Sequence, residues 1–249
     1  MNERALYDRF HELKRQRHCV FETDAGEAVT SPGMPLWIRL REGTDARPFF
    51  CAFLREWPGA LHQLVAEGEA ARACAQAYAH KTGAAFTTKE MVAYMLPGEV
   101  GLPDGGGVLH LPETVADCVT VLQWIKLFRE EAFGEVPPPI REEGVAPPQG
   151  EAYPPLYLWQ SAPGGVPMAM GSISPGEDIR RLNLVFTPKE NRRKGYGRAL
   201  VAALCGVVRG EGKMPVLYTY GDNTGAMRLY AGLGFVEAGR LVEVTFIRP

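Results

Sequence analysis

The segment from Leu182 to Leu200 constrains the fold more than any other part of the chain, because it combines a strand, a loop and a helix start. Its first residues, 182–186, form an apolar run that is typical of a strand and stops at Pro188, which cannot donate to a sheet. A basic, glycine-containing turn, residues 192–197, comes next. The apolar residues that follow are spaced as in a helix: Leu200, Val201, Leu204, Val207 and Val208.

The basic turn predicts an anion site. Gly195 and Gly197 at a helix start let the backbone come close to a ligand, and the exposed N–H groups and the helix dipole favour negative charge there. Three cations, Arg192, Arg193 and Lys194, act in the same direction. A solvated charge run is the alternative, and the glycines and the helix weigh against it. We therefore expect a phosphate or pyrophosphate cradle.

Composition places few further limits on the function. The 249 residues suffice for two modest domains or one large domain, and 46% apolar with 22% charged residues is typical of a soluble globular protein. A net charge of −2 gives no reason to expect nucleic acid or a membrane as partner. We expect a cytoplasmic protein without a signal peptide, membrane span or metal site, whose five scattered cysteines are reduced thiols.

The first hundred residues carry no motif that we can connect to chemistry. Their patterns predict a short strand over 36–40 and helices over residues 2–17, 47–56 and 59–80, with another helix starting at Thr87–Glu90. A run of glycines and prolines over residues 97–107 is the best candidate for a domain boundary. We therefore expect a smaller, mostly helical accessory domain over residues 1–103 and a second domain over residues 104–249.

The second domain is predicted to be a mixed α/β structure, neither all-parallel nor all-β. Its expected strands cover residues 108–111, 156–159, 166–170, 182–186, 216–219, 235–236 and 241–247, and the second and third of them form a hairpin. Its expected helices cover residues 114–133, the apolar pattern of residues 200–208 that follows Gly197, and residues 224–233. A Pro/Glu-rich stretch over residues 137–148 is either a linker or a surface loop.

A second candidate site stretch follows the strand that ends near Thr219. Asn223 is a good N-cap residue, and Tyr230 lies seven positions later, on the same side of the helix. If the strands that end at Thr187 and Thr219 are parallel neighbours, both helix starts lie at one edge of the sheet. That edge would then combine an anion cradle with a phenol.

Three segments together resemble the GNAT superfamily of acyl-CoA-dependent N-acyltransferases. Residues 192–197 fit its Gln/Arg-x-x-Gly-x-Gly/Ala signature, the stretch from Asn223 to Tyr230 fits its later Asn…Tyr segment, and Gly234-Phe235 fits the glycine and phenylalanine that end that helix. The resemblance covers residues 105–249. Residues 180–188 also resemble a bacterial subgroup with an additional N-terminal domain.

The resemblance implies the GNAT fold and acetyl-CoA as co-substrate. In this family the backbone N–H groups of the turn bind the pyrophosphate, and a strand pairs with the pantetheine arm, while one of its N–H groups, here that of Val185 or Phe186, polarises the thioester carbonyl. Asn223 is implied to contact the cofactor as well as to cap its helix. The implied cofactor-binding residues are Val185, Phe186, Thr187, Arg192, Arg193, Lys194, Gly195, Tyr196, Gly197, Arg198 and Asn223.

The implied reaction is direct attack of a neutral amine on the thioester, which needs two proton transfers. Tyr230 fits the family's general acid, because a phenol with a pKa near ~10 matches a thiolate and is neutral at pH 7. A core aromatic is the alternative for Tyr230. The base is left open among Glu177, Asp178, Glu243 and a water chain, with Asn183 able to orient a water.

The leading hypothesis is an N-acetyltransferase that acts on a small-molecule or protein amine. The alternative is a non-catalytic acyl-CoA-binding module with a regulatory or partner-binding role. A nucleotide-binding protein is a weaker alternative, because the chain has no Walker lysine pattern. The acceptor and the acyl-chain preference stay open, and so does the oligomeric state, with a homodimer as one option.

Overall fold

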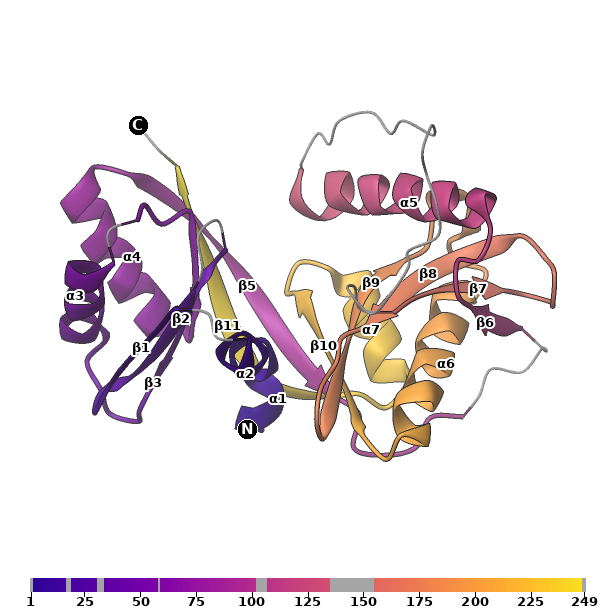
Figure 1. Cartoon of the computed structure of the whole chain (residues 1–249), viewed down its shortest axis with the longest axis horizontal. Helices are drawn as coiled ribbons and strands as arrows, with labels where there is room; N and C mark the ends of the chain where they lie inside the picture. Colours follow the sequence, from indigo (N-terminus) through magenta and orange to yellow (C-terminus); the bar gives the residue numbers. More distant parts are fainter. Residues whose placement is uncertain are drawn as a thin grey trace. The chain divides into compact units, whose positions relative to one another are not determined.

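The computed structural model describes residues 2–16, 19–30, 34–57, 59–101, 107–134 and 155–247 (Figure 1). Contacts within the chain divide it into two compact units. The first unit comprises residues 1–94, 218–228 and 237–249, and the second comprises residues 95–217 and 229–236. This division differs from the single boundary expected after residue 103, because two C-terminal segments pack with the first unit.

The first unit is built on strands in the order β1-β2-β3-β4-β11-β5. These strands are β1 (Cys19–Thr23), β2 (Gly26–Thr30), β3 (Leu36–Leu40), β4 (Gln63–Ala66), β11 (Val236–Ile247) and β5 (Ala85–Met95). The helices are α1 (Glu3–Leu6), α2 (Asp8–Arg15), α3 (Ala46–Glu56) and α4 (Gly68–Thr82). The end of the chain joins this unit because β11 pairs antiparallel with β4, Val242 opposite Ala66 and Thr245 opposite Gln63.

The expected helices and strand of this unit are confirmed only in part. Strand β3 and helix α3 lie where they were predicted, whereas the helix expected over residues 2–17 is divided at Tyr7 into α1 and α2. Two predictions are wrong: the helix over residues 59–80 contains strand β4 before α4 begins, and the helix start at Thr87–Glu90 lies inside strand β5. The unit is therefore richer in strands than the expected mostly helical domain.

Pairing in the sheet explains these differences. Residues 91–94 of β5 and Leu64–Ala66 of β4 are buried, and packing on a sheet decides such segments more than local helix-start patterns do. The hairpin of β1 and β2 was not predicted. At the start of β2, a Cβ on Gly26 would lie 2.5 Å from the carbonyl oxygen of Arg39, so only glycine allows this pairing.

The core of the first unit lies between the sheet and the two helices α3 and α4, which lie side by side (Figure 1). Phe49, Phe50 and Phe53 of α3 are buried in it. Tyr78 of α4 packs on Phe246 of β11 with ring centroids 4.4 Å apart. Both helices therefore bury one face and leave the other to solvent.

The second unit is built on strands in the order β10-β9-β8-β7-β6. These are β6 (Val108–His110), β7 (Leu156–Gln160), β8 (Pro167–Ile173), β9 (Ile179–Phe186) and the first residues of β10 (Met214–Tyr220). The helices are α5 (Val115–Phe133), α6 (Tyr196–Gly210) and the end of α7 (Thr224–Gly232), with the 3₁₀ turn η1 (Lys189–Asn191) before α6. The mixed α/β architecture expected from the sequence is thus confirmed.

Strands β9 and β10 are parallel neighbours, as the sequence argument required. Their ladder runs from Ile179 opposite Met214 to Leu182 opposite Leu217, while β6, β7, β8 and β9 pair antiparallel in turn. The predicted hairpin of β7 and β8 is confirmed. The two strands expected after residue 235 are one strand, β11.

Two predictions concern residues that the structure does not describe, namely the Pro/Glu-rich stretch over 137–148 and the centre of the boundary run, residues 102–106. In the described part of the chain, no helix is long and apolar enough to span a bilayer.

Candidate functional site

Strand β9 carries a bulge at its C-terminal end. Asn183 lies opposite Ser172 and Phe186 lies opposite Met170, so β9 has one residue more than β8 over this stretch. Leu184 has a φ of 50°, which is rare for a branched side chain. A bulge of this kind bends its strand and reorients the backbone groups around it. The parallel ladder with β10 has its last pair in this unit at Leu182, before the bulge.

A buried polar cluster supports the bulge. Arg181 is 4% exposed, and its Nε donates to Asn183 Oδ1 at 2.9 Å. Asn183 Nδ2 donates to Ser174 Oγ at 2.7 Å, and Arg181 Nη2 donates to the same oxygen at 3.3 Å. The amide of Asn183 is therefore occupied by hydrogen bonds to Arg181 and Ser174, which argues against the water-orienting role considered from the sequence. Sequence reasoning missed this cluster, although an arginine inside an apolar strand is a signal of it.

The turn before α6 has the backbone geometry of an anion site. Arg193 and Gly195 both have left-handed φ values, 62° and 85°. Gly195 is the N-cap of α6 and no side chain caps the helix. The first N–H groups of a helix have no partner within it, and here they are left for a ligand that carries negative charge.

Gly197 allows close packing at the first turn of α6. A Cβ at this position would lie 3.1 Å from Thr187 Oγ1 and 3.5 Å from Leu229 Cδ1 of α7. On α7, a Cβ on Gly232 would lie 3.1 Å from Arg198 Nη1. The two glycines therefore bring the first turn of α6 against Thr187 and the end of α7, while Gly195 provides the left-handed backbone.

The three cations of the turn have different surroundings. Arg192 Nε donates to the carbonyl oxygen of Thr187 at 2.8 Å, and its Nη2 lies 2.5 Å from Glu131 Oε2 of α5. Arg193 and Lys194 are exposed and make no ion pair with any other described residue. The contact of Arg192 with Glu131 could not be predicted, because 61 positions separate the two residues.

The other predicted cofactor-binding residues lie around the same turn. Val185, Thr187 and Tyr196 are half-buried, and Arg198 is exposed on the first turn of α6. Phe186 is 5% exposed, and its ring packs against Trp124 and Phe128 of α5 with centroids 6.4 Å away. The Phe186 side chain is thus a core residue, and only its backbone remains available for a ligand.

Tyr230 lies in α7 and is 6% exposed, with its ring centroid 5.8 Å from that of Phe235. Burial raises the pKa of Tyr230 well above the ordinary value of 10.0, and Cys205 acts in the same direction. The phenol is therefore protonated at neutral pH, as a general acid must be. The same burial also fits a core aromatic, so the catalytic role of Tyr230 stays a prediction.

Asn223 caps α7, as predicted. Its Oδ1 accepts a hydrogen bond from the Ala226 backbone N at 3.1 Å, which is the usual contact of an N-cap side chain with the third helical residue. The capping role is confirmed, whereas a contact with the cofactor stays a prediction.

The structure separates the base candidates without selecting one. Glu177 and Asp178 are exposed in the second unit. Glu243 belongs to the first unit, where the Tyr220 hydroxyl donates to its two carboxylate oxygens at 3.2 Å. Burial raises the pKa of Glu243 above its ordinary value of 4.5, although the bond from Tyr220 acts in the opposite direction. Among the residues described, no group of three metal-ligating side chains could hold an ion.

Comparison with known proteins agrees with the sequence motifs. Residues 174–244, which contain β9, the basic turn and α7, match the family model described as FR47-like protein. The search of curated proteins found no match.

Several solved structures share the fold. A GCN5-related N-acetyltransferase from Kribbella flavida is 16% identical, with a TM-score of 0.62 over 98% of this chain and 96% of that one. A GCN5-related N-acetyltransferase from Sphaerobacter thermophilus is 18% identical, with a TM-score of 0.60 over 90% and 78%. An acetyltransferase from the GNAT family of Colwellia psychrerythraea is 15% identical, with a TM-score of 0.53 over 92% and 84%. These similarities show that the chain has the fold of GNAT N-acetyltransferases.

Proposed function

We propose that the protein transfers an acetyl group from acetyl-CoA to a primary amine, by direct attack of the amine while both substrates are bound. One observation carries this proposal: a bulged strand leads through a left-handed turn into a helix that is capped only by Gly195. Gly197 keeps the first turn of that helix close to Thr187. This arrangement suits a ligand that has both a pyrophosphate and an extended arm.

The residues around the turn fit acetyl-CoA. The N–H groups from Arg193 to Arg198 would hold the pyrophosphate, and the exposed side chains of Arg193 and Lys194 would balance its charge. The backbone of Val185 and Thr187 would pair with the pantetheine arm like an added strand. The bulge supports this role, because it turns backbone groups of β9 away from regular pairing with β8.

Acetyl-CoA supplies the thioester, and the chain supplies the proton transfers. Tyr230 is proposed to protonate the departing thiolate, and its raised pKa keeps the proton on the phenol until then. The amine must lose a proton before it attacks. We assign no base. The candidate carboxylates of the second unit, Glu177 and Asp178, are exposed, and nothing in their surroundings favours them over a water chain as the proton acceptor.

A second function, acyl-CoA binding without catalysis, is favoured by the burial of Tyr230. A phenol that is 6% exposed has little surface with which to reach a substrate. In that case the turn would still bind acetyl-CoA, and the protein would act through a partner.

An assay of acetyl-CoA-dependent thiol release with a panel of amines separates the two functions. We expect turnover with at least one amine and a loss of about 10²-fold in kcat for Tyr230→Phe. The acetyl-CoA affinity of the variant serves as the control and should stay unchanged, since the hydroxyl lies outside the phosphate cradle. An unchanged kcat would remove Tyr230 from the mechanism, and tight binding without any turnover would favour the second function.

A further inference from the structure

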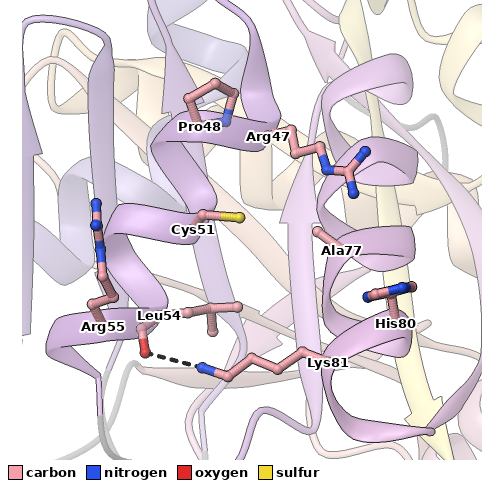
Figure 2. A pocket seen from close by; sticks show the side chains of 8 residues that line it. All are labelled: Arg47, Pro48, Cys51, Leu54, Arg55, Ala77, His80 and Lys81. Carbon is pink, nitrogen blue, oxygen red and sulfur yellow. Dashed lines mark hydrogen bonds between the residues drawn. The ribbon is translucent and has the colours of Figure 1, made fainter.

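A groove of ≈ 470 Å³ lies in the first unit, between α3 and α4 (Figure 2). Four of the side chains that line it are basic: Arg47, Arg55, His80 and Lys81. Leu54 and small apolar residues line the rest, together with the thiol of Cys51. None of the residues that line the groove belongs to the acetyl-transfer site proposed above.

No aspartate or glutamate is among the residues that line this groove, although Asp45 caps α3 and its Oδ1 accepts a hydrogen bond from the Arg47 backbone N at 3.0 Å. Residues 46–55 and 70–89, which include every lining residue, contain no aspartate or glutamate. Within the described part of the chain, the four basic side chains form no ion pair. A concave surface lined by charges of one sign concentrates the field and attracts ions of opposite charge.

Arg47 is the most informative of these four basic residues. It lies in the first turn of α3, where the helix dipole is positive and a cation gains nothing from it. The other three lie in the last turns of α3 and α4, where the dipole favours cations. The helix dipole therefore favours those three but not Arg47, which lies two positions after the acidic N-cap residue Asp45.

Side chains from both helices extend into the groove (Figure 2). Arg47 extends from α3 toward α4, and Lys81 extends from α4 toward α3 (Figure 2). Lys81 Nζ donates to the carbonyl oxygen of Leu54 at 3.5 Å, which holds the ammonium across the lower part of the groove. The Cys51 thiol points into the space between the helices.

We propose that this groove binds a small organic phosphate. Arg47, His80 and Lys81 bind the phosphate oxygens, because a guanidinium offers paired donors, and the imidazole and the ammonium add further donors. The carbon part of the ligand packs on Leu54 and on the stem of Cys51. The volume lies within the range of pockets for small molecules.

Cys51 provides a reporter inside the groove. Cys19 and Cys51 are exposed, whereas the other three cysteines, Cys74, Cys118 and Cys205, are buried. In a Cys19→Ser chain, iodoacetamide therefore alkylates Cys51 alone. Sodium pyrophosphate serves as the probe, with sodium chloride of equal ionic strength as the reference. At ten times its Kd, pyrophosphate should slow alkylation of Cys51 about tenfold, by occupancy alone. Equal rates with pyrophosphate and chloride would overturn the proposal.

Substitutions identify the groups that bind. In the Cys19→Ser chain, Arg47→Gln and Lys81→Gln should each raise the pyrophosphate concentration for half-protection by about tenfold. Arg72→Gln is the matched control, because Arg72 is exposed on α4 outside the groove, and it should change nothing. Full protection in the Arg47→Gln, Lys81→Gln double variant would contradict the assignment. An alkylation rate without pyrophosphate close to that of the parent chain verifies that each variant keeps the groove.

A measurement on the unmodified chain covers the case in which the variants fail to fold. Anionic iodoacetate should react faster at Cys51 than at Cys19, when each rate is divided by that of neutral iodoacetamide at the same thiol. Equal ratios at the two thiols would show that the groove attracts no anions, which would contradict the proposal. Protection by ADP but not by glucose 6-phosphate would identify a nucleotide as the ligand class, and the reverse would identify a sugar phosphate.

Discussion

Arg192 is the clearest case in which one residue differs from its sequence interpretation. The motif predicts a cation that faces a phosphate, but the guanidinium is bound by Glu131 and by the carbonyl oxygen of Thr187. Lys189 also approaches Glu131, at 3.8 Å. The Glu131 carboxylate therefore competes with a bound phosphate for the charged groups of Arg192 and Lys189.

We expect Glu131→Gln to tighten acetyl-CoA binding by up to about fivefold, since a half-exposed ion pair contributes up to ~1 kcal/mol. Calorimetric titration measures the change. Glu130→Gln is the control, because Glu130 pairs with Lys126 of the same helix and leaves the turn untouched. Weaker binding by Glu131→Gln would mean that the carboxylate positions Arg192 for the phosphate rather than competing with it.

The raised pKa of Glu243 predicts how the stability of the folded chain depends on pH. Its folded pKa is raised by burial above the unfolded value near 4.5, so between these two values the folded chain binds more protons than the unfolded chain. The contribution of Glu243 to stability therefore falls as pH rises through this window. Urea unfolding from pH 4 to 8 should show a steeper decline for the parent than for Glu243→Gln. A difference between the two that does not vary with pH would contradict the raised pKa.

At the scale of elements, the join between β9 and α6 is the structural basis of the proposed site. The first turn of α6 packs closely against Thr187, since a Cβ at residue 197 would lie 3.1 Å from Thr187 Oγ1. Gly197→Ala should raise the helix propensity by up to ~1 kcal/mol and still weaken acetyl-CoA binding about tenfold, because the added methyl shifts this turn.

Gly210→Ala tests this account within the same helix. A Cβ at Gly210, the last residue of α6, meets nothing within 4 Å. This variant should leave acetyl-CoA affinity unchanged and keep or raise the melting temperature. Equal losses of affinity in the two variants would show that the helix, rather than its first turn, determines binding.

The helices and strands that the sequence predicted well are those whose signals are local. The helices α3, α5, α6 and α7 have regular apolar spacing, caps or glycine breaks, and all were expected. The strands β4 and β5 were missed because their burial comes from partners in the sheet, which short patterns do not reveal. For the same reason the motif located the turn at Arg192 but not its partner Glu131 in α5.

At the scale of the whole molecule, the chain forms two units that are not divided at one point of the sequence. The cause is a pairing across most of the chain, in which Val242 of β11 lies opposite Ala66 of β4. A run of glycines and prolines suggested a boundary, but composition carries no information about so distant a partner. The GNAT superfamily motifs and the turn before α6, by contrast, were readable because they lie within 60 residues of each other.

Calorimetric titration of acetyl-CoA into the full chain tests the central claim most directly, namely that the turn before α6 binds the pyrophosphate of this substrate. We predict one site with a Kd of about 1–100 μM, an affinity that falls with added salt, and a loss of about tenfold in Gly197→Ala but none in Gly210→Ala. The absence of binding up to millimolar acetyl-CoA, or equal affinity in Gly197→Ala and the parent chain, would contradict the account.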